Sequence, residues 1–72
     1  MRFNSNKIGR AFLNAKAGLQ AVDITKRETL TTNYAIANAR KASLNKLETL
    51  TLLAMFKTHK QRHPEFYGQE PR

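Results

Sequence analysis

The stretch LNKLETLTLLAMFKTHKQRH, residues 44–63, is strongly apolar in its first two thirds and positively charged at its end. From Leu50 to Phe56 it contains no charged residue, and Thr51 is the single polar one. At about 100° per residue these side chains point to every side of a helix, and a helix that is apolar all round is buried all round. The stretch therefore predicts a helix that other parts of the structure must cover.

Residues that break helices are confined to the two ends of the chain. Glycine occurs at positions 9, 18 and 68 and proline at 64 and 71, so neither interrupts residues 19–63. Strand signals are weak, because no pair of alternating apolar segments flanks an Asn-Gly or Asp-Gly turn. We predict an all-α fold, a small bundle of three helices at about residues 5–21, 26–42 and 44–62. One helical domain is expected over residues 1–63, with a C-terminal tail over 64–72.

The first of these helices has a cap signal and one apolar stripe. Asn4 or Ser5 can accept hydrogen bonds from the first turn, and Phe3 and Ile8 are spaced as a hydrophobic staple. The stripe predicts packing against the other helices and consists of Ile8, Ala11, Phe12, Ala15, Leu19 and Val22. An acid-free amphipathic start is also typical of organellar presequences and of helices that lie on membrane surfaces.

Two capping-box patterns mark the later helix starts. Thr25 with Glu28 predicts a turn at residues 22–24, and Asn45 with Glu48 predicts a new start after a break at 42–45. No glycine separates the second and third helices, so a continuous rod of about 36 residues, roughly 54 Å long, is the alternative to the break that we expect. The alanines of the second helix are either helix-favouring filler or a seam for close packing, and they are Ala35, Ala39 and Ala42.

Two short helices with one stripe each cannot cover the third helix completely. A chain of this length buries only about 60% of the surface that its unfolded form exposes, so help from a partner is expected. We predict a homodimer whose self-association surface is formed by Leu50, Leu52, Leu53, Met55 and Phe56. The alternative is that the C-terminal tail folds back and covers this helix with Phe66 and Tyr67.

The charge of the chain indicates its kind of partner. Thirteen Lys and Arg against five Asp and Glu give a net charge of +8, which attracts polyanions. Cations near the end of the third helix and around the preceding turn predict a phosphate-binding patch of Arg40, Lys41, Lys46, Lys57, Lys60 and Arg62. Cations at a helix C-terminus also stabilise the helix dipole, which explains any single one of them equally well. His59 and His63 are expected to add charge below about pH 6.5.

Several functional classes lack support in the sequence. His59 and His63 have the spacing of two metal ligands on a helix, but no third ligand lies nearby in sequence, so no metal site is expected. The chain has no cysteine, no catalytic constellation and no phosphate-binding loop, so we expect neither an enzyme nor a cofactor or small-molecule substrate. Its longest apolar run, residues 52–56, is far shorter than the about 20 residues of a membrane span.

The functional prediction is a small basic accessory or regulatory protein of the cytoplasm. In the first hypothesis its basic patch binds nucleic acid, DNA or RNA, through phosphates without reading the base sequence. In the alternative hypothesis it is a protein-binding module, for example an inhibitor, that docks on an acidic surface of a larger enzyme or assembly.

Overall fold

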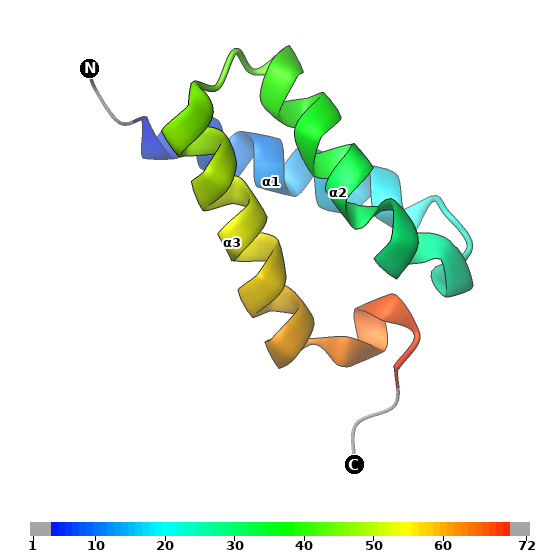
Figure 1. The fold of residues 1–72 in the computed structure, drawn as a ribbon. Helices are drawn as coiled ribbons and strands as arrows, with labels where there is room; N and C mark the ends of the chain where they lie inside the picture. The colour runs from blue at the N-terminus through cyan, green and yellow to red at the C-terminus, as the bar shows by residue number, and fades with distance from the viewer. Residues whose placement is uncertain (1–3, 70–72) are drawn as a thin grey trace.

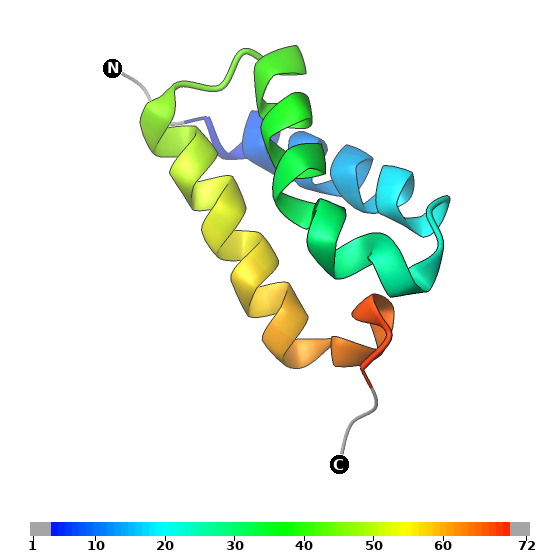
Figure 2. The same cartoon turned by 45° about the vertical axis from the view of Figure 1, so that its right-hand side comes forward.

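The computed structural model describes residues 4–69, which form three α-helices followed by a short 3-10 helix (Figure 1). The helices are α1 (Ser5–Gln20), α2 (Ile24–Lys41), α3 (Lys46–Arg62) and η1 (Pro64–Tyr67). α1 and α2 form an antiparallel hairpin, α3 packs against both, and η1 turns back onto α2 and α3 (Figure 2). No strand occurs in residues 4–69, so the prediction of a small all-α bundle of three helices is confirmed.

Local cap signals decide where α1 and α3 begin. The Asn4 side chain accepts a hydrogen bond from the N–H of Lys7 at 3.1 Å. At the start of α3, Asn45 accepts from the N–H of Glu48 at 2.8 Å, and the Glu48 carboxylate accepts from the N–H of Asn45 at 3.0 Å. Both predicted caps are confirmed, while the Phe3 half of the expected staple lies outside the described residues.

The predicted capping box at the start of α2 is wrong. The helix begins one residue before Thr25, and the cap is Asp23, whose carboxylate accepts from the N–H of Thr25 at 3.1 Å. A carboxylate at this position also interacts favourably with the positive end of the helix dipole. Glu28 does not reach back to Thr25, because Lys60 and Gln69 bind its carboxylate instead.

The break between α2 and α3 forms without a glycine. Ser43 adopts a left-handed backbone with φ of 57°. The N–H of Leu44 donates to the carbonyl of Ala39 at 2.9 Å, and the N–H of Ser43 donates to the carbonyl of Arg40 at 3.0 Å. These two bonds form a Schellman motif, which satisfies the last carbonyls of α2 and turns the chain. The predicted break at residues 42–45 is confirmed, and the continuous rod is excluded.

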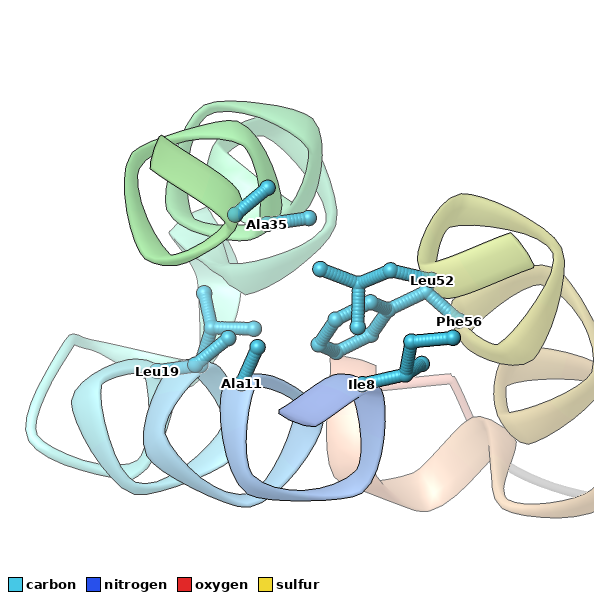
Figure 3. Packing of buried hydrophobic residues seen from close by; sticks show 8 residues of the cluster. Ile8, Ala11, Leu19, Ala35, Leu52 and Phe56 are labelled. Carbon is cyan, nitrogen blue, oxygen red and sulfur yellow. The ribbon is translucent and has the colours of Figure 1, made fainter. Parts of the chain in front are cut away.

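The core lies where the three helices meet. Figure 3 shows Leu52 and Phe56 of α3 entering the space between α1 and α2. Its buried members are Ile8, Ala11, Ala15, Leu19, Ala35, Ala39, Leu52 and Phe56. The alanines of α2 therefore form a packing seam. At Gly18 the approach of α1 to α2 is so close that a Cβ there would lie 2.8 Å from a ring carbon of Tyr34.

The first part of the C-terminal tail belongs to the bundle. Tyr67 is buried and Phe66 is partly buried against the core. Gly68 ends η1 in the left-handed conformation, with φ of 80°, which glycine adopts without strain. The tail thus covers one side of α3, as the alternative to self-association predicts.

Candidate nucleic-acid interface

A groove of about 360 Å³ lies between the start of α1 and the end of α2. The antiparallel hairpin brings these two segments together, although more than twenty residues separate them in the sequence. The groove is lined by three cations, two amides and two alanines, namely Lys7, Arg10, Lys41, Asn14, Asn38, Ala11 and Ala42. The alanines leave space between the longer polar side chains, so the groove is open to a ligand that needs positive charge and hydrogen-bond donors.

The helical repeat explains why these residues share one groove. Lys7, Arg10 and Asn14 are three and four positions apart on α1, and Asn38 and Lys41 are three apart on α2. Each set therefore occupies one helix face, and the two faces flank the same groove.

Within residues 4–69, none of the three cations of the groove forms an ion pair. The Lys7 ammonium donates to the carbonyl of Ser43 at 3.1 Å, which fixes it over the last turn of α2. Arg10 and Lys41 are exposed, and within residues 4–69 neither forms an ion pair. In the part of the chain that the structure describes, no carboxylate lines the groove. An approaching anion therefore meets positive charge from both helices.

The carboxylate nearest to this end of the molecule is held inside the structure. Glu48 is buried, and its Oε2 accepts from the N–H of Asn4 at 2.8 Å while its Oε1 accepts from the N–H of Asn45. The backbone donors of Asn45 and Asn4, and the charge of Lys7, lower the pKa of Glu48 against the opposing effect of burial. Glu48 thus joins the starts of α1 and α3 and does not present its charge at the surface.

The six cations predicted to form one patch lie at two ends of the molecule. Lys41 lines the groove, and Arg40 and Lys46 are exposed on either side of the α2–α3 turn. The other three follow along α3, and about 24 Å of helix separates Lys46 from the last of them. They are Lys57, Lys60 and Arg62.

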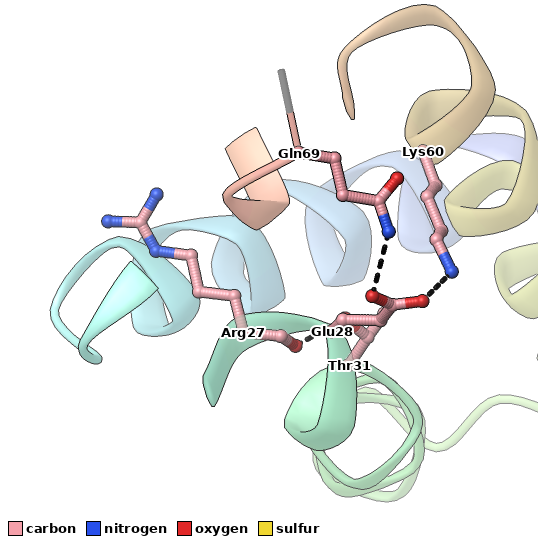
Figure 4. Close-up of polar contacts among 5 residues, drawn as sticks. All are labelled: Arg27, Glu28, Thr31, Lys60 and Gln69. Carbon is pink, nitrogen blue, oxygen red and sulfur yellow. Dashed lines mark hydrogen bonds and ion pairs between the residues drawn. The ribbon is translucent and has the colours of Figure 1, made fainter. Parts of the chain in front are cut away.

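The charge at the far end of α3 is partly neutralised. Figure 4 shows the Glu28 carboxylate between the Lys60 ammonium and the side chain of Gln69, which donates at 3.0 Å. The hydrogen bond and charge of Lys60 lower the pKa of Glu28. His63 lies 3.4 Å from a carboxylate oxygen of Glu65. This end of α3 therefore offers less free positive charge than its sequence indicates.

The expectation that His59 adds charge near neutral pH is wrong. Its Nδ1 lies 3.0 Å from the hydroxyl of Tyr67, and its ring contacts Phe12 and Phe66 edge to face. Burial in this aromatic cluster lowers the pKa of His59, and the nearby charges of Lys16 and His63 lower it further. His59 therefore gains its charge at a lower pH than an exposed histidine does, and its contacts attach η1 to α3.

Four groove residues escaped the sequence-based site prediction: Lys7, Arg10, Asn14 and Asn38. The basic, acid-free face of the first helix was visible in the sequence. Its partner face on α2 was not, because that pairing depends on how the hairpin is packed.

The residues predicted for self-association differ in burial and form three groups. Leu52 and Phe56 lie in the core, exposed by 0% and 3%, because α1 and α2 cover that side of α3. Leu53 and Met55 are partly buried against the core, whereas Leu50 remains 54% exposed. The surface available to a second copy is therefore smaller than the sequence indicates.

Three further observations bear on the class of protein. None of the helices in residues 4–69 has the length and apolar character needed to cross a membrane. Within the same range, no cluster of three or more His, Asp or Glu side chains is arranged to hold a metal ion. Comparison of the chain with protein-family models, curated proteins and solved structures finds no match.

Proposed function

We propose that this protein binds nucleic acid through phosphates, and that it does so with the groove between α1 and α2. The observation that carries the proposal is the convergence of Lys7, Arg10 and Lys41 on one groove that contains no carboxylate. Arg40 and Lys46 extend the positive surface around the adjoining turn. We call these five residues the cationic end.

The chemistry of the groove suits a sugar-phosphate backbone. Lys and Arg neutralise phosphates and release their counterions, which gives affinity without sequence preference. The amides of Asn14 and Asn38 are of the type that hydrogen-bonds phosphate and sugar oxygens. Among residues 4–69 no aromatic side chain lines the groove, so none of them contributes stacking on bases there. The proposed role is that of an accessory or regulatory protein of the cytoplasm, and the homodimer predicted from the sequence stays a prediction.

The test is a salt titration of binding to a short DNA duplex, followed by fluorescence anisotropy. For the wild type, log Kd is expected to rise with log salt between about 50 and 200 mM, by about 0.9 per phosphate neutralised. Replacing Lys7, Arg10 and Lys41 together with glutamine is expected to lower that slope by up to about 2.7. Circular dichroism at each step verifies that the helices are retained.

A control variant that loses the same charge elsewhere distinguishes binding in the groove from general attraction of DNA to a positively charged protein. The triple replacement of Lys26, Lys57 and Arg62 with glutamine removes the same charge from outside the groove, and it is expected to leave most of the slope intact. Equal losses from both triple variants, or a wild type with no salt-dependent binding, would contradict the proposal.

A further inference from the structure

We propose that the exposed face of α3 binds an acidic amphipathic helix of a partner protein. This surface shares Lys46 with the cationic end but does not overlap the groove between α1 and α2, and the inference does not depend on nucleic-acid binding. It rests on an apolar stripe, an adjoining groove and the charges around them.

The stripe runs along the outer side of α3. Leu47 and Leu50 are 62% and 54% exposed, and Ala54 is also exposed. Their spacing of three and four residues places them on one face, opposite the core residues Leu52 and Phe56. A single exposed leucine is ordinary on a protein surface, but two leucines on consecutive turns beside an exposed alanine form a contiguous apolar patch of the kind that marks an interaction site.

A shallow groove of about 400 Å³ adjoins this stripe between α3 and α1. Phe12 of α1 lines it together with seven residues of α3 and its C-terminal cap, namely Thr51, Ala54, Met55, Thr58, His59, Arg62 and His63. Thr51 and Thr58 are two helical turns apart, so the groove runs along α3 for about 11 Å. A helix laid on α3 can place one large apolar side chain in this groove while its neighbours cover the leucines, which is the helix-in-groove mode of recognition.

The charges on α3 indicate which kind of partner fits this surface. The exposed charged residues of α3 are all cations, namely Lys46, Lys57 and Arg62. Lys60 is partly exposed and forms an ion pair with Glu28. The single carboxylate of α3, Glu48, is buried on the side of the core. A second copy of the chain would set cations against cations, whereas a helix with Asp and Glu beside its apolar face would find opposite charges along its length. We therefore assign the surface to an acidic helix, in place of the second copy that the sequence predicts.

The probe is a synthetic peptide of about five turns, with leucines at i, i+3, i+4 and i+7 spacing and glutamates on both sides of them. A second peptide with lysines in place of the glutamates has the same apolar face. Binding to the full chain is measured by fluorescence anisotropy, and amide chemical shifts map the contact. The acidic peptide is expected to bind with shifts concentrated at Thr51, Ala54 and Thr58, and the lysine peptide is expected to bind at least about tenfold more weakly.

The chain provides a matched control for the apolar contact. Leu13 on the outer side of α1 is 61% exposed, nearly the same as Leu47. The double variant Leu47→Gln, Leu50→Gln is expected to weaken acidic-peptide binding at least about tenfold, and Leu13→Gln is expected to leave it unchanged. Because all three positions are exposed, the fold tolerates both variants, and thermal melting verifies it.

Three results would overturn the inference. The first is acidic-peptide binding that the double variant leaves unchanged, and the second is equal binding of the lysine peptide. The third is a wild-type dimer in sedimentation that Leu50→Gln dissociates, because this result would make a second copy the occupant. Failure of this inference and failure of nucleic-acid binding can be told apart. The Lys7, Arg10, Lys41 triple variant should retain peptide binding, and the Leu47, Leu50 double variant should retain the DNA salt slope.

Discussion

Replacing the two glycines of α1 with alanine is expected to change the free energy of unfolding in opposite directions. In a helix interior, alanine is more favourable than glycine by about 0.8–1.0 kcal/mol. A Cβ at Gly9 meets nothing within 4 Å, so Gly9→Ala should gain about 0.5–1 kcal/mol. A Cβ at Gly18 would lie 2.8 and 2.9 Å from two ring carbons of Tyr34. Carbon atoms settle at about 3.5–4.0 Å, so the ring or the helix must move by more than half an ångström.

Overpacking of this kind costs about 1–3 kcal/mol. After subtraction of the gain in helix propensity, Gly18→Ala should lose up to about 2 kcal/mol. Urea unfolding followed by circular dichroism measures both values, and an unchanged denaturant slope verifies that the folded and unfolded states remain comparable. In thermal melting, each kcal/mol corresponds to about 4–8 °C for a domain of this size.

The ring of Tyr34 supplies the control. In a Tyr34→Ala background the contact is absent, so Gly18→Ala should stabilise the protein as Gly9→Ala does, and the double-mutant cycle measures the clash. If Gly18→Ala stabilised the wild type by as much as Gly9→Ala, the close approach of α1 to α2 would be refuted.

Two further predictions follow from the pKa shifts. The pKa of Glu48 is lowered, so its ionised form stabilises the fold above its unfolded pKa of about 4.3, and this contribution is lost as the pH falls through the folded pKa. Glu48→Gln should therefore be less stable than the wild type at pH 7 in urea titrations, and a difference that persisted unchanged at pH 2 would contradict the assignment. The pKa of His59 is also lowered, so the fold binds fewer protons than the unfolded chain, and the stability should decrease as the pH falls from about 6.5 through the folded pKa. An NMR titration of the His59 imidazole measures this directly, and a midpoint at or above about 6.5 would show that the ring is not buried against Phe66 and Tyr67.

Features that depend on a few consecutive residues were predictable from the sequence. Asn45 and Glu48 form their capping box because both partners lie within one turn. The same pattern at Thr25 and Glu28 failed because Asp23 lies closer to the free N–H groups and because Lys60 binds Glu28 from 32 positions away. A local motif is therefore a good guide only where no distant residue competes for the same group.

The sequence predicts that α3 must be covered, but not which segment covers it. The sequence required that something besides the first two helices cover residues 50–56, and the candidates were a second copy or the tail. Whether the tail or a second copy covers α3 depends on the position of η1. In the structure η1 packs against α2 and α3 and buries Tyr67. Short, alanine-rich helices also approach more closely than their stripes indicate, so two of them cover more of α3 than was expected.

The candidate site was the least predictable feature, because folding rearranges charge. Residues that are close in sequence, such as Arg40 and Lys57, are placed toward opposite ends of α3, whereas Lys7 and Lys41 meet across the hairpin. The carboxylates in the described part of the chain are also concentrated in one region. Apart from the buried Glu48, they lie at the α1–α2 turn and around η1, the end of the bundle away from the cationic end. Within residues 4–69, the six cations outside the cationic end share their part of the molecule with these three carboxylates, whereas an approaching polyanion meets no exposed carboxylate at the cationic end.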